Sequence, residues 1–227
     1  MNKYIHLNIT TEGQTEFRFV KDVLCKHLLP FGIYCNVRSV LTSKEYKKRG
    51  GMTSYVKVKK DIQQWMKQDN SADRRFTTMF DYYALPNDFP GYVDAQKLNN
   101  PYDKIACIEK AFAEDMNDYR FIPYFQLHEF EALIYSDLDI LSHEYENKAN
   151  AIKHLKKVLS QAPFNNNPEL INDRKETSPS HRIITKIPEY QKVSSGSLLT
   201  DLITIDKIRA KCQHFNEWLI RMENLNH

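Results

Sequence analysis

Six acidic residues fall in three short segments, each of which follows a run of apolar residues. They are Glu12 and Glu16 in TTEGQTE, Asp81 and Asp88 in FDYYALPNDFPG, and Glu129 and Glu131 in LHEFEA. Because the carboxyl ends of parallel strands share one edge of an α/β sheet, carboxylates far apart in sequence can meet there. Oxygen ligands gathered at one edge suit a hard divalent cation, Mg²⁺ or Mn²⁺. The pattern therefore predicts a metal site at this edge.

The first segment has a structural interpretation as well as a chemical one. Glu12 stands where a strand should end, and Glu16 stands on the first turn of the helix that should follow. Gly13 permits a sharp turn, and a helix N-terminus favours phosphate oxygens. Glutamate at a helix start is also common for capping and for its interaction with the helix dipole. Both interpretations stay open for this segment.

The other two segments differ in how directly they point to a metal. Asp81 ends a predicted strand, whereas Asp88 lies in the Pro-rich loop that follows, where it could bind metal or make an Asx turn. If the third segment is helical, Glu129 and Glu131 point to different sides, so we expect Glu129 alone to reach the metal. His128 is either a proton carrier or ligand, or a hydrogen-bonded structural residue.

Apolar periodicity predicts the elements that must position these carboxylates. Strands are expected at residues 5–9, 33–41, 75–80 and 121–127, and helices at 17–28, 55–66 and 101–112. This alternation predicts an α/β fold with a mostly parallel central sheet flanked by helices. We expect residues 1–140 to form this core and residues 141–227 to form a helical C-terminal extension packed on it as one compact unit.

Within the extension, a helix is expected at residues 149–159 and another at 205–225. Residues 161–180 are too rich in Pro, Asn and Asp for regular structure, which predicts a long loop. A short helical segment carrying Arg182 and Lys186 should follow this loop.

The composition and the residue pattern argue against a disordered, fibrous, zinc-binding or membrane-spanning protein. The 227 residues are 41% hydrophobic and 27% charged, as in ordinary globular proteins, and the formal net charge is +3. The four cysteines have no zinc-site spacing, and no apolar run is long enough to span a bilayer. We therefore expect a cytoplasmic protein with no membrane partner. One basic cluster stands out, and it includes Lys47, Lys48 and Arg49.

The three acidic segments, read as EGQTE, FDYYALPNDFPG and PYFQLHEFEALIYSD, resemble the DUF4276 family. NDRKETSPSHRI, YQKV and KCQHFNEWL resemble C-terminal motifs of the same family, so the resemblance covers nearly the whole chain. Such proteins are regarded as relatives of TOPRIM domains, the metal-binding fold of topoisomerases, primases and OLD-type nucleases. The resemblance implies a TOPRIM-like core with an acidic divalent-metal centre.

Two positions depart from the patterns that this resemblance implies. Glu12 matches the TOPRIM glutamate and Asp81 the first aspartate, but Tyr83 stands where the second aspartate of Asp-x-Asp is usual. A further ligand would then come from Glu16, Asp88 or Glu129. In addition, Arg174 replaces a glycine that the family has in its NDRKETSPS motif.

The resemblance and the acidic segments together predict a Mg²⁺- or Mn²⁺-dependent nuclease that acts on DNA or RNA. Glu12, Asp81 and Glu129 are the expected catalytic residues, with Glu16 and Asp88 as additional metal ligands. Lys47, Lys48, Arg49, Arg182 and Lys186 are expected to bind substrate phosphates, unless they form an ordinary solvated surface.

Family analogy adds an ATPase partner and a role in defence against phage or plasmids. The alternative is a non-catalytic module that binds nucleic acid or an ATPase partner, because a fold alone does not determine activity. Nucleotidyl transfer of the primase type is a third interpretation, although no separate nucleotide-binding motif accompanies it.

Overall fold

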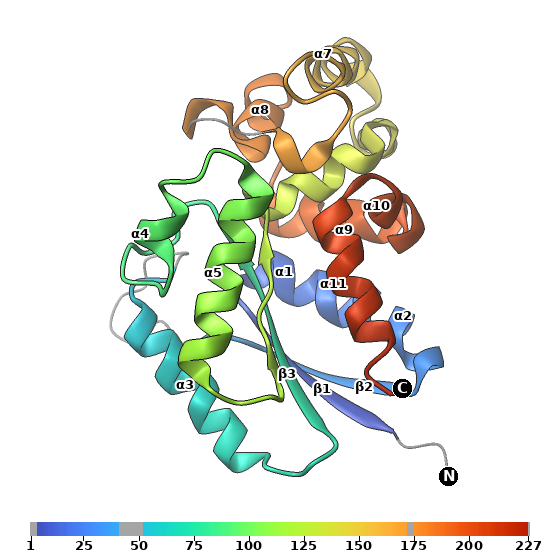
Figure 1. Ribbon diagram of the computed structural model, residues 1–227. Helices are drawn as coiled ribbons and strands as arrows, with labels where there is room; N and C mark the ends of the chain where they lie inside the picture. Colours follow the sequence, from blue (N-terminus) through green and yellow to red (C-terminus); the bar gives the residue numbers. More distant parts are fainter. Residues whose placement is uncertain (1–3, 41–51, 172–174, 227) are drawn as a thin grey trace.

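A five-stranded parallel sheet forms the centre of the protein (Figure 1). The structure is a computed structural model that describes residues 4–40, 52–171 and 175–226. The strands are β1 (Ile5–Thr11), β2 (Ile33–Ser39), β3 (Arg74–Asp81), β4 (Phe121–Ile122) and β5 (Phe125–Gln126). Their order is β2-β1-β3-β4, β5 also pairs with β3, and all four pairings are parallel. The prediction of an α/β fold with a mostly parallel sheet is confirmed.

The predicted fourth strand is divided into β4 and β5 by Pro123, which has no N–H to donate to a neighbouring strand. Beside the break, the side chain of Thr78 replaces the missing ladder bonds. Its Oγ1 accepts from the Tyr124 amide at 2.9 Å and donates to the Tyr124 carbonyl at 2.8 Å. The register is kept across the break, with Phe76 opposite Phe121 and Phe80 opposite Phe125.

Three helices cover one face of the sheet and lie on the left in Figure 1. They are α3 (Tyr55–Gln68), α4 (Tyr92–Ala95) and α5 (Pro101–Met116). In α3, Val58, Ile62 and Met66 recur at helical spacing and are all buried in the apolar cluster on this face. Asn100 caps α5, because its side chain accepts from the Tyr102 amide at 2.9 Å.

Helices from both ends of the chain cover the opposite face. The N-terminal part contributes α1 (Gln14–Phe19), a π-helical turn (Val20–Leu24), α2 (Cys25–Leu28) and the 3₁₀ turn η2 (Leu29–Phe31). The C-terminal part contributes α9 (Lys192–Ile203), α10 (Ile205–Lys211) and α11 (Gln213–Glu223). Trp218 of α11 stacks on Tyr124 and donates to the Thr77 hydroxyl at 3.0 Å, which ties the C-terminal helices to the sheet.

The remaining elements join the sheet to the C-terminal helices. They are η3 (Phe130–Ile140), α6 (Leu141–Glu144), η4 (Glu146–Lys148), α7 (Ala149–Ser160), η5 (Pro168–Leu170), η6 (Lys175–Thr177) and α8 (Pro179–Lys186). The helical C-terminus is confirmed. The single helix expected at 205–225 is wrong in one respect, because the backbone is extended at Cys212 and separates α10 from α11. Among the described helices, none combines the length and the apolar character needed to cross a membrane.

Candidate metal centre

Three parallel strands bring the three acidic segments to one edge of the sheet. β3 lies between β1 and β5, Glu12 directly follows β1, and Asp81 is the last residue of β3. Glu129 follows β5 after two intervening residues and is the N-cap residue of η3. The Asp81 amide donates to Glu12 Oε2 at 3.2 Å, so the ends of β1 and β3 are in direct contact. The shared edge expected from the sequence is therefore present.

Glu16 joins Glu12 because the chain turns sharply between them. The Gly13 amide donates to Glu16 Oε2 at 2.9 Å, and Glu16 is the third residue of α1. A Cβ atom at position 13 would lie 2.9 Å from the same Oε2, so a larger residue would displace the end of the Glu16 side chain. This hydrogen bond is the capping interaction considered from the sequence. It also holds the carboxylate of Glu16 next to Glu12.

Glu129 and Glu131 both lie in the cluster and contact the same lysine, which corrects the expectation that their side chains point to different sides. Their exposed fractions are 3% and 2%, and the ammonium of Lys192 lies 2.9 Å from Glu129 Oε2 and 3.3 Å from Glu131 Oε2. Glu129 has an extended backbone before a 3₁₀ helix, so the alternation expected for an α-helix does not apply. The Ser180 amide, at the start of α8, donates to Glu129 Oε1 at 2.5 Å. We call Glu12, Glu16, Asp81, Glu129 and Glu131 the acidic centre.

The acidic centre holds more buried carboxylates than it can ionise together. Burial and the neighbouring Glu16 raise the pKa of Glu12 to about 7. Burial and the neighbouring Glu129 raise the pKa of Glu131 to about 7, although Lys192 opposes this shift. Burial, followed by repulsion from Glu16 and Glu12, raises the pKa of Asp81 well above its ordinary value. A cation placed among these groups would favour their ionised forms.

Glu129 is the exception in the acidic centre. Burial acts to raise its pKa, but the Lys192 ammonium and the Ser180 amide outweigh burial and lower the pKa below its ordinary value. The pKa of Lys192 is raised in turn, because attraction to Glu131 and Glu129 exceeds the effect of its own burial. Glu129 and Lys192 thus form a charged pair at one side of the acidic centre.

One oxygen of Asp81 distinguishes it from the other carboxylates of the acidic centre. Its Oδ1 atom is buried and has no hydrogen-bond partner among the residues that the structure describes. A buried carboxylate oxygen without a donor is unfavourable, and a bound cation removes that cost. Carboxylate oxygens from Glu12, Glu16 and Asp81 match the donor type that Mg²⁺ and Mn²⁺ prefer.

The described side chains of the acidic centre do not converge on one point as the ligands of a bound metal ion do. Within residues 4–40, 52–171 and 175–226, no group of three or more His, Cys, Asp or Glu side chains surrounds one point closely enough to hold an ion. Glu12 and Glu16 accept from backbone amides, and Glu129 and Glu131 are held by Lys192. Metal binding would therefore require Glu12, Glu16 and Asp81 to turn toward a common point.

Asp88 is not part of the acidic centre, so its proposed role as a metal ligand needs correction. Its Oδ2 atom accepts from the Tyr55 amide at 2.9 Å, at the start of α3. This contact satisfies a backbone donor that a helix leaves free in its first turn. The structural alternative considered for Asp88 is therefore the better description, although the amide belongs to a distant helix and not to its own turn.

Tyr83, which replaces the second aspartate of the TOPRIM pattern, is tied to the third acidic segment through its backbone. Its amide donates to the His128 carbonyl at 2.6 Å. His128 has a left-handed backbone, with φ at 67°, and a buried side chain. This bond positions the chain immediately before Glu129.

The basic residues predicted to bind phosphate fall into two groups. Lys47, Lys48 and Arg49 lie outside the described residues. Arg182 and Lys186 are on α8, the helix whose first turn contacts Glu129. Arg182 Nε donates to the Thr177 carbonyl at 2.6 Å, and its guanidinium lies 5.5 Å from the centre of the Phe164 ring. Lys186 is exposed.

Two residues of the site were missed from the sequence, Glu131 and Lys192. The prediction for Glu131 assumes a regular α-helix. Lys192 lies in the segment YQKV and is the first residue of α9, and nothing in that segment indicates a contact with Glu129. The signal that could have suggested the ion pair is the position of Lys192 in YQKV, a segment that resembles a family motif in the same way as the acidic segments do.

The fold and the site together define an α/β protein with carboxylates at the carboxyl ends of a parallel sheet. The sequence model of DUF4276, a domain of unknown function, matches residues 11–223, and the chain belongs to this family. No curated protein and no solved structure matches the chain.

Proposed function

We propose that this protein is a Mg²⁺- or Mn²⁺-dependent nuclease with a TOPRIM-like acidic centre, which hydrolyses phosphodiester bonds in DNA or RNA. The observation that carries the proposal is Asp81 Oδ1, which is buried beside four other carboxylates and lacks a hydrogen-bond donor among the described residues. A cation at this point would relieve both the repulsion and the unpaired oxygen. An ATPase partner and a role in phage or plasmid defence enter the proposal from the resemblance alone.

In this proposal Glu12, Glu16 and Asp81 hold the ion. They come from two adjacent strand ends and the first turn of α1, so a rigid sheet edge positions them. A divalent ion held there supplies polarisation of a phosphate oxygen and activation of water. Glu16 and the Oδ1 atom of Asp81 are buried, and reduced contact with solvent strengthens their interaction with charge in the site.

Glu129 and Lys192 have a different role. Glu129 accepts from Ser180 with one oxygen and from Lys192 with the other, so it is the positioning residue for the Lys192 ammonium. The side chain of Lys192 is 43% exposed, which leaves its charge accessible to a substrate phosphate beside the acidic centre. This role of Glu129 replaces the direct metal ligation that the sequence suggested.

A second function is supported by the same ion pair. Lys192 already neutralises part of the acidic centre, and the described side chains form no finished metal site. A protein in which this lysine permanently replaces the cation would be a non-catalytic module that binds nucleic acid or a protein partner. Metal-dependent cleavage of nucleic acid is expected of the nuclease and not of the non-catalytic module.

The test is cleavage of labelled single-stranded and double-stranded DNA and RNA by purified protein in Mg²⁺, Mn²⁺ or EDTA. We expect the wild-type protein to cleave in the presence of the metal and to be inactive in EDTA. Asp81→Asn should reduce the rate by about 100-fold or more, because it removes a ligand charge while keeping the side-chain size.

Asp88→Asn is the matched control, since Asp88 lies outside the acidic centre and Asn can still accept from the Tyr55 amide. This variant should cleave at the wild-type rate. Cleavage that persists in EDTA, or that is equal in wild type and Asp81→Asn, would contradict the proposal. Absence of cleavage by folded wild-type protein on every substrate, with nucleic-acid binding retained, would support the non-catalytic module.

A further inference from the structure

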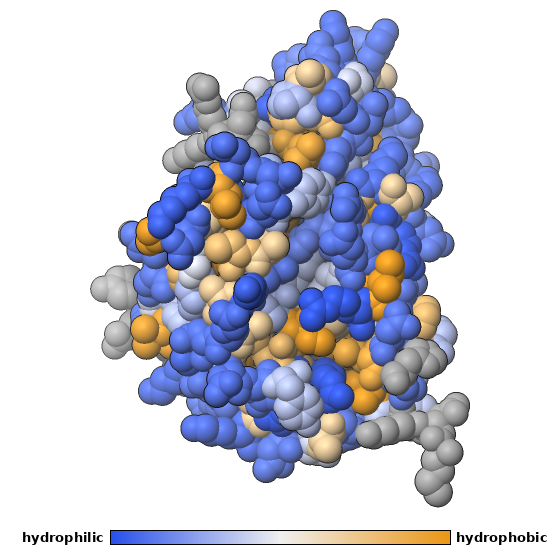
Figure 2. All heavy atoms as spheres, viewed as in Figure 1, coloured by the Kyte–Doolittle hydropathy of each residue, from blue (hydrophilic) through white to orange (hydrophobic). Residues whose placement is uncertain are grey.

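Helices α7 and α8 carry only basic charges. The sequence of α7 is ANAIKHLKKVLS and that of α8 is PSHRIITK, so neither contains an aspartate or a glutamate. Together they contribute Lys153, Lys156, Lys157, Arg182 and Lys186. The two helices are in contact at one end of the molecule, the top in Figure 1. The surface at this end is predominantly hydrophilic in Figure 2.

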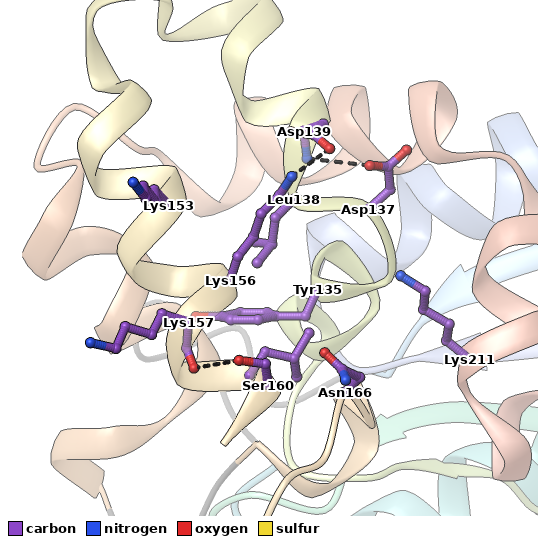
Figure 3. A pocket seen from close by; sticks show the side chains of 11 residues that line it. Tyr135, Asp137, Leu138, Asp139, Lys153, Lys156, Lys157, Ser160, Asn166 and Lys211 are labelled. Atoms are coloured by element: carbon purple, nitrogen blue, oxygen red, sulfur yellow. Dashed lines mark hydrogen bonds and ion pairs between the residues drawn. The ribbon is translucent and has the colours of Figure 1, made fainter.

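A cleft lies along the side of α7 that faces η3 and α10. Its volume is about 540 Å³, and four lysines and two aspartates are among the residues that line it (Figure 3). The lysines are Lys153, Lys156, Lys157 and Lys211, and the aspartates are Asp137 and Asp139. Positive charge therefore exceeds negative charge along its walls.

Both aspartates of this cleft form ion pairs with lysines, whereas some of its lysines form no ion pair with a described residue. Lys156 pairs with Asp139 at 2.5 Å, and Asp137 pairs with Lys207. Lys153 and Lys157 have no ion-pair partner within the described part of the chain, and both are exposed. In Figure 3 the ends of these two side chains point away from the Lys156–Asp139 pair. The Lys156–Asp139 pair thus links α7 to η3, while the Lys153 and Lys157 side chains are exposed.

A second cleft, of about 180 Å³, lies between α7 and α8 and continues the positive surface. His154, His181, Arg182 and Lys186 line it, with Glu176 as the single acidic residue among those lining it. Lys186 has no ion-pair partner among the described residues. The basic surface therefore extends from Lys153 and Lys157 across α7 to Lys186.

This surface is joined to the acidic centre through α8. The first turn of α8 contacts Glu129 through the Ser180 amide, and the last residue of the helix is Lys186. A helix of 8 residues is about 12 Å long. Since phosphates of a stacked strand are about 3.4 Å apart along the axis, this length corresponds to a few nucleotides.

We propose that Lys153 and Lys157 of α7, together with Lys186 of α8, bind the phosphodiester backbone of a nucleic acid whose neighbouring segment reaches the acidic centre. The inference rests on the proposed nuclease function and adds the surface that holds the substrate. The binding is electrostatic and independent of sequence, because the surface offers ammonium groups and no described contact that would read a base edge. It does not require a metal ion, since none of the three lysines touches the acidic centre.

The test measures binding and not cleavage, so that its outcome is separate from that of the proposed activity. Fluorescently labelled single-stranded and double-stranded DNA and RNA of mixed sequence are titrated with full-length protein in EDTA at several salt concentrations. The variant is Lys153→Gln with Lys157→Gln. The matched control is Lys21→Gln with Lys26→Gln, two exposed lysines of the π-helical turn and α2 at the other end of the molecule.

We expect the α7 variant to bind at least about fivefold more weakly than the control at moderate salt. The slope of log Kobs against log salt should decrease by about 1.4 for single strands or about 1.8 for duplex, the value for two lost phosphate contacts. Equal affinity of the α7 variant and the control overturns the inference, as does absence of nucleic-acid binding by the wild-type protein. Binding of the wild-type protein to phosphatidylserine vesicles but not to nucleic acid also overturns it.

Discussion

Two of the places where the described residues bury carboxylates can be compared, and the difference between them separates a structural role from a chemical one. The first place is the acidic centre. The second is a contact that we call the helix clasp, which consists of Glu169 with Tyr102, His214 and Phe215. Glu169 has an exposed fraction of 0% and lies between α5 and the start of α11.

In the helix clasp both oxygens of the Glu169 carboxylate accept hydrogen bonds. Glu169 accepts from the amides of His214 and Phe215 at 3.0 Å each and from the Tyr102 hydroxyl at 3.1 Å. The two amides belong to the first turn of α11, where helices leave N–H groups without intrahelical partners. Burial raises the pKa of Glu169, and these amides oppose that shift. The carboxylate caps a helix and fastens it to α5.

The acidic centre has the opposite arrangement. Lys192 contacts two of the five carboxylates, Glu129 and Glu131, and Asp81 Oδ1 has no donor within the described residues. A buried charge that only stabilises a fold is surrounded by donors, as in the helix clasp. A group of buried charges left short of donors costs stability, and such strain is typical of functional sites. The comparison therefore favours cation binding at the acidic centre and a fold-stabilising role for the helix clasp.

The largest effect that this comparison predicts is on stability at the helix clasp. Glu169→Ala removes the acceptor of two buried amides and leaves a cavity, so the free energy of unfolding should fall by about 3–5 kcal/mol. Glu217→Ala, at an exposed position of α11, is the control and should change the free energy of unfolding by about 0.5 kcal/mol or less. Urea denaturation in EDTA measures both. A loss below about 1 kcal/mol for Glu169→Ala would show that the clasp is not essential to the fold.

A smaller effect is expected for the lysine of the acidic centre. Lys192→Met leaves Glu129 and Glu131 without their ammonium partner, which should lower the free energy of unfolding by about 2 kcal/mol in EDTA. Added Mn²⁺ should restore stability more strongly in this variant than in wild type, because it supplies the missing positive charge. Lys192→Arg, which keeps the charge, is the control. Thermal denaturation with and without Mn²⁺ provides the measurement, and identical Mn²⁺ responses in wild type and Lys192→Met would argue against a cation site.

The comparison also predicts how stability depends on pH. Glu12 and Glu131 have pKa values of about 7 in the fold, against an ordinary value of 4.5. Between these values the folded protein binds more protons than the unfolded chain, so the free energy of unfolding should fall as the pH rises from about 4.5 through about 7. Glu129 has the opposite shift, and its contribution is lost as the pH falls below its ordinary pKa.

We expect the free energy of unfolding to be lower at about pH 8 than at about pH 5 in EDTA, measured by urea denaturation. Saturating Mg²⁺ should reduce the difference, since the cation favours the ionised carboxylates. The Glu12→Gln/Glu131→Gln double variant should also reduce it. Stability that increases steadily over this range in EDTA would contradict the assignment of raised pKa values to the acidic centre.

Most of the fold could be predicted from local patterns. The alternation in β1 and β3 and the helical spacing in α3 and α5 are properties of short segments, and each lies where the sequence places it. Helix α9 was not predicted, and breaks within two predicted elements were missed. Pro123 interrupts the fourth strand, and the extended backbone at Cys212 divides the last helix.

The sequence by itself determined that Glu12, Asp81 and Glu129 follow strands, and a parallel sheet then requires those strand ends to share an edge. Only the tertiary structure decided that Glu131 and Lys192 complete the acidic centre and that Asp88 caps α3 instead. The physical reason is that periodicity reports which face of its own element a side chain occupies. It contains no information on which distant element packs against that face, and the partner of a buried charge is set by that packing.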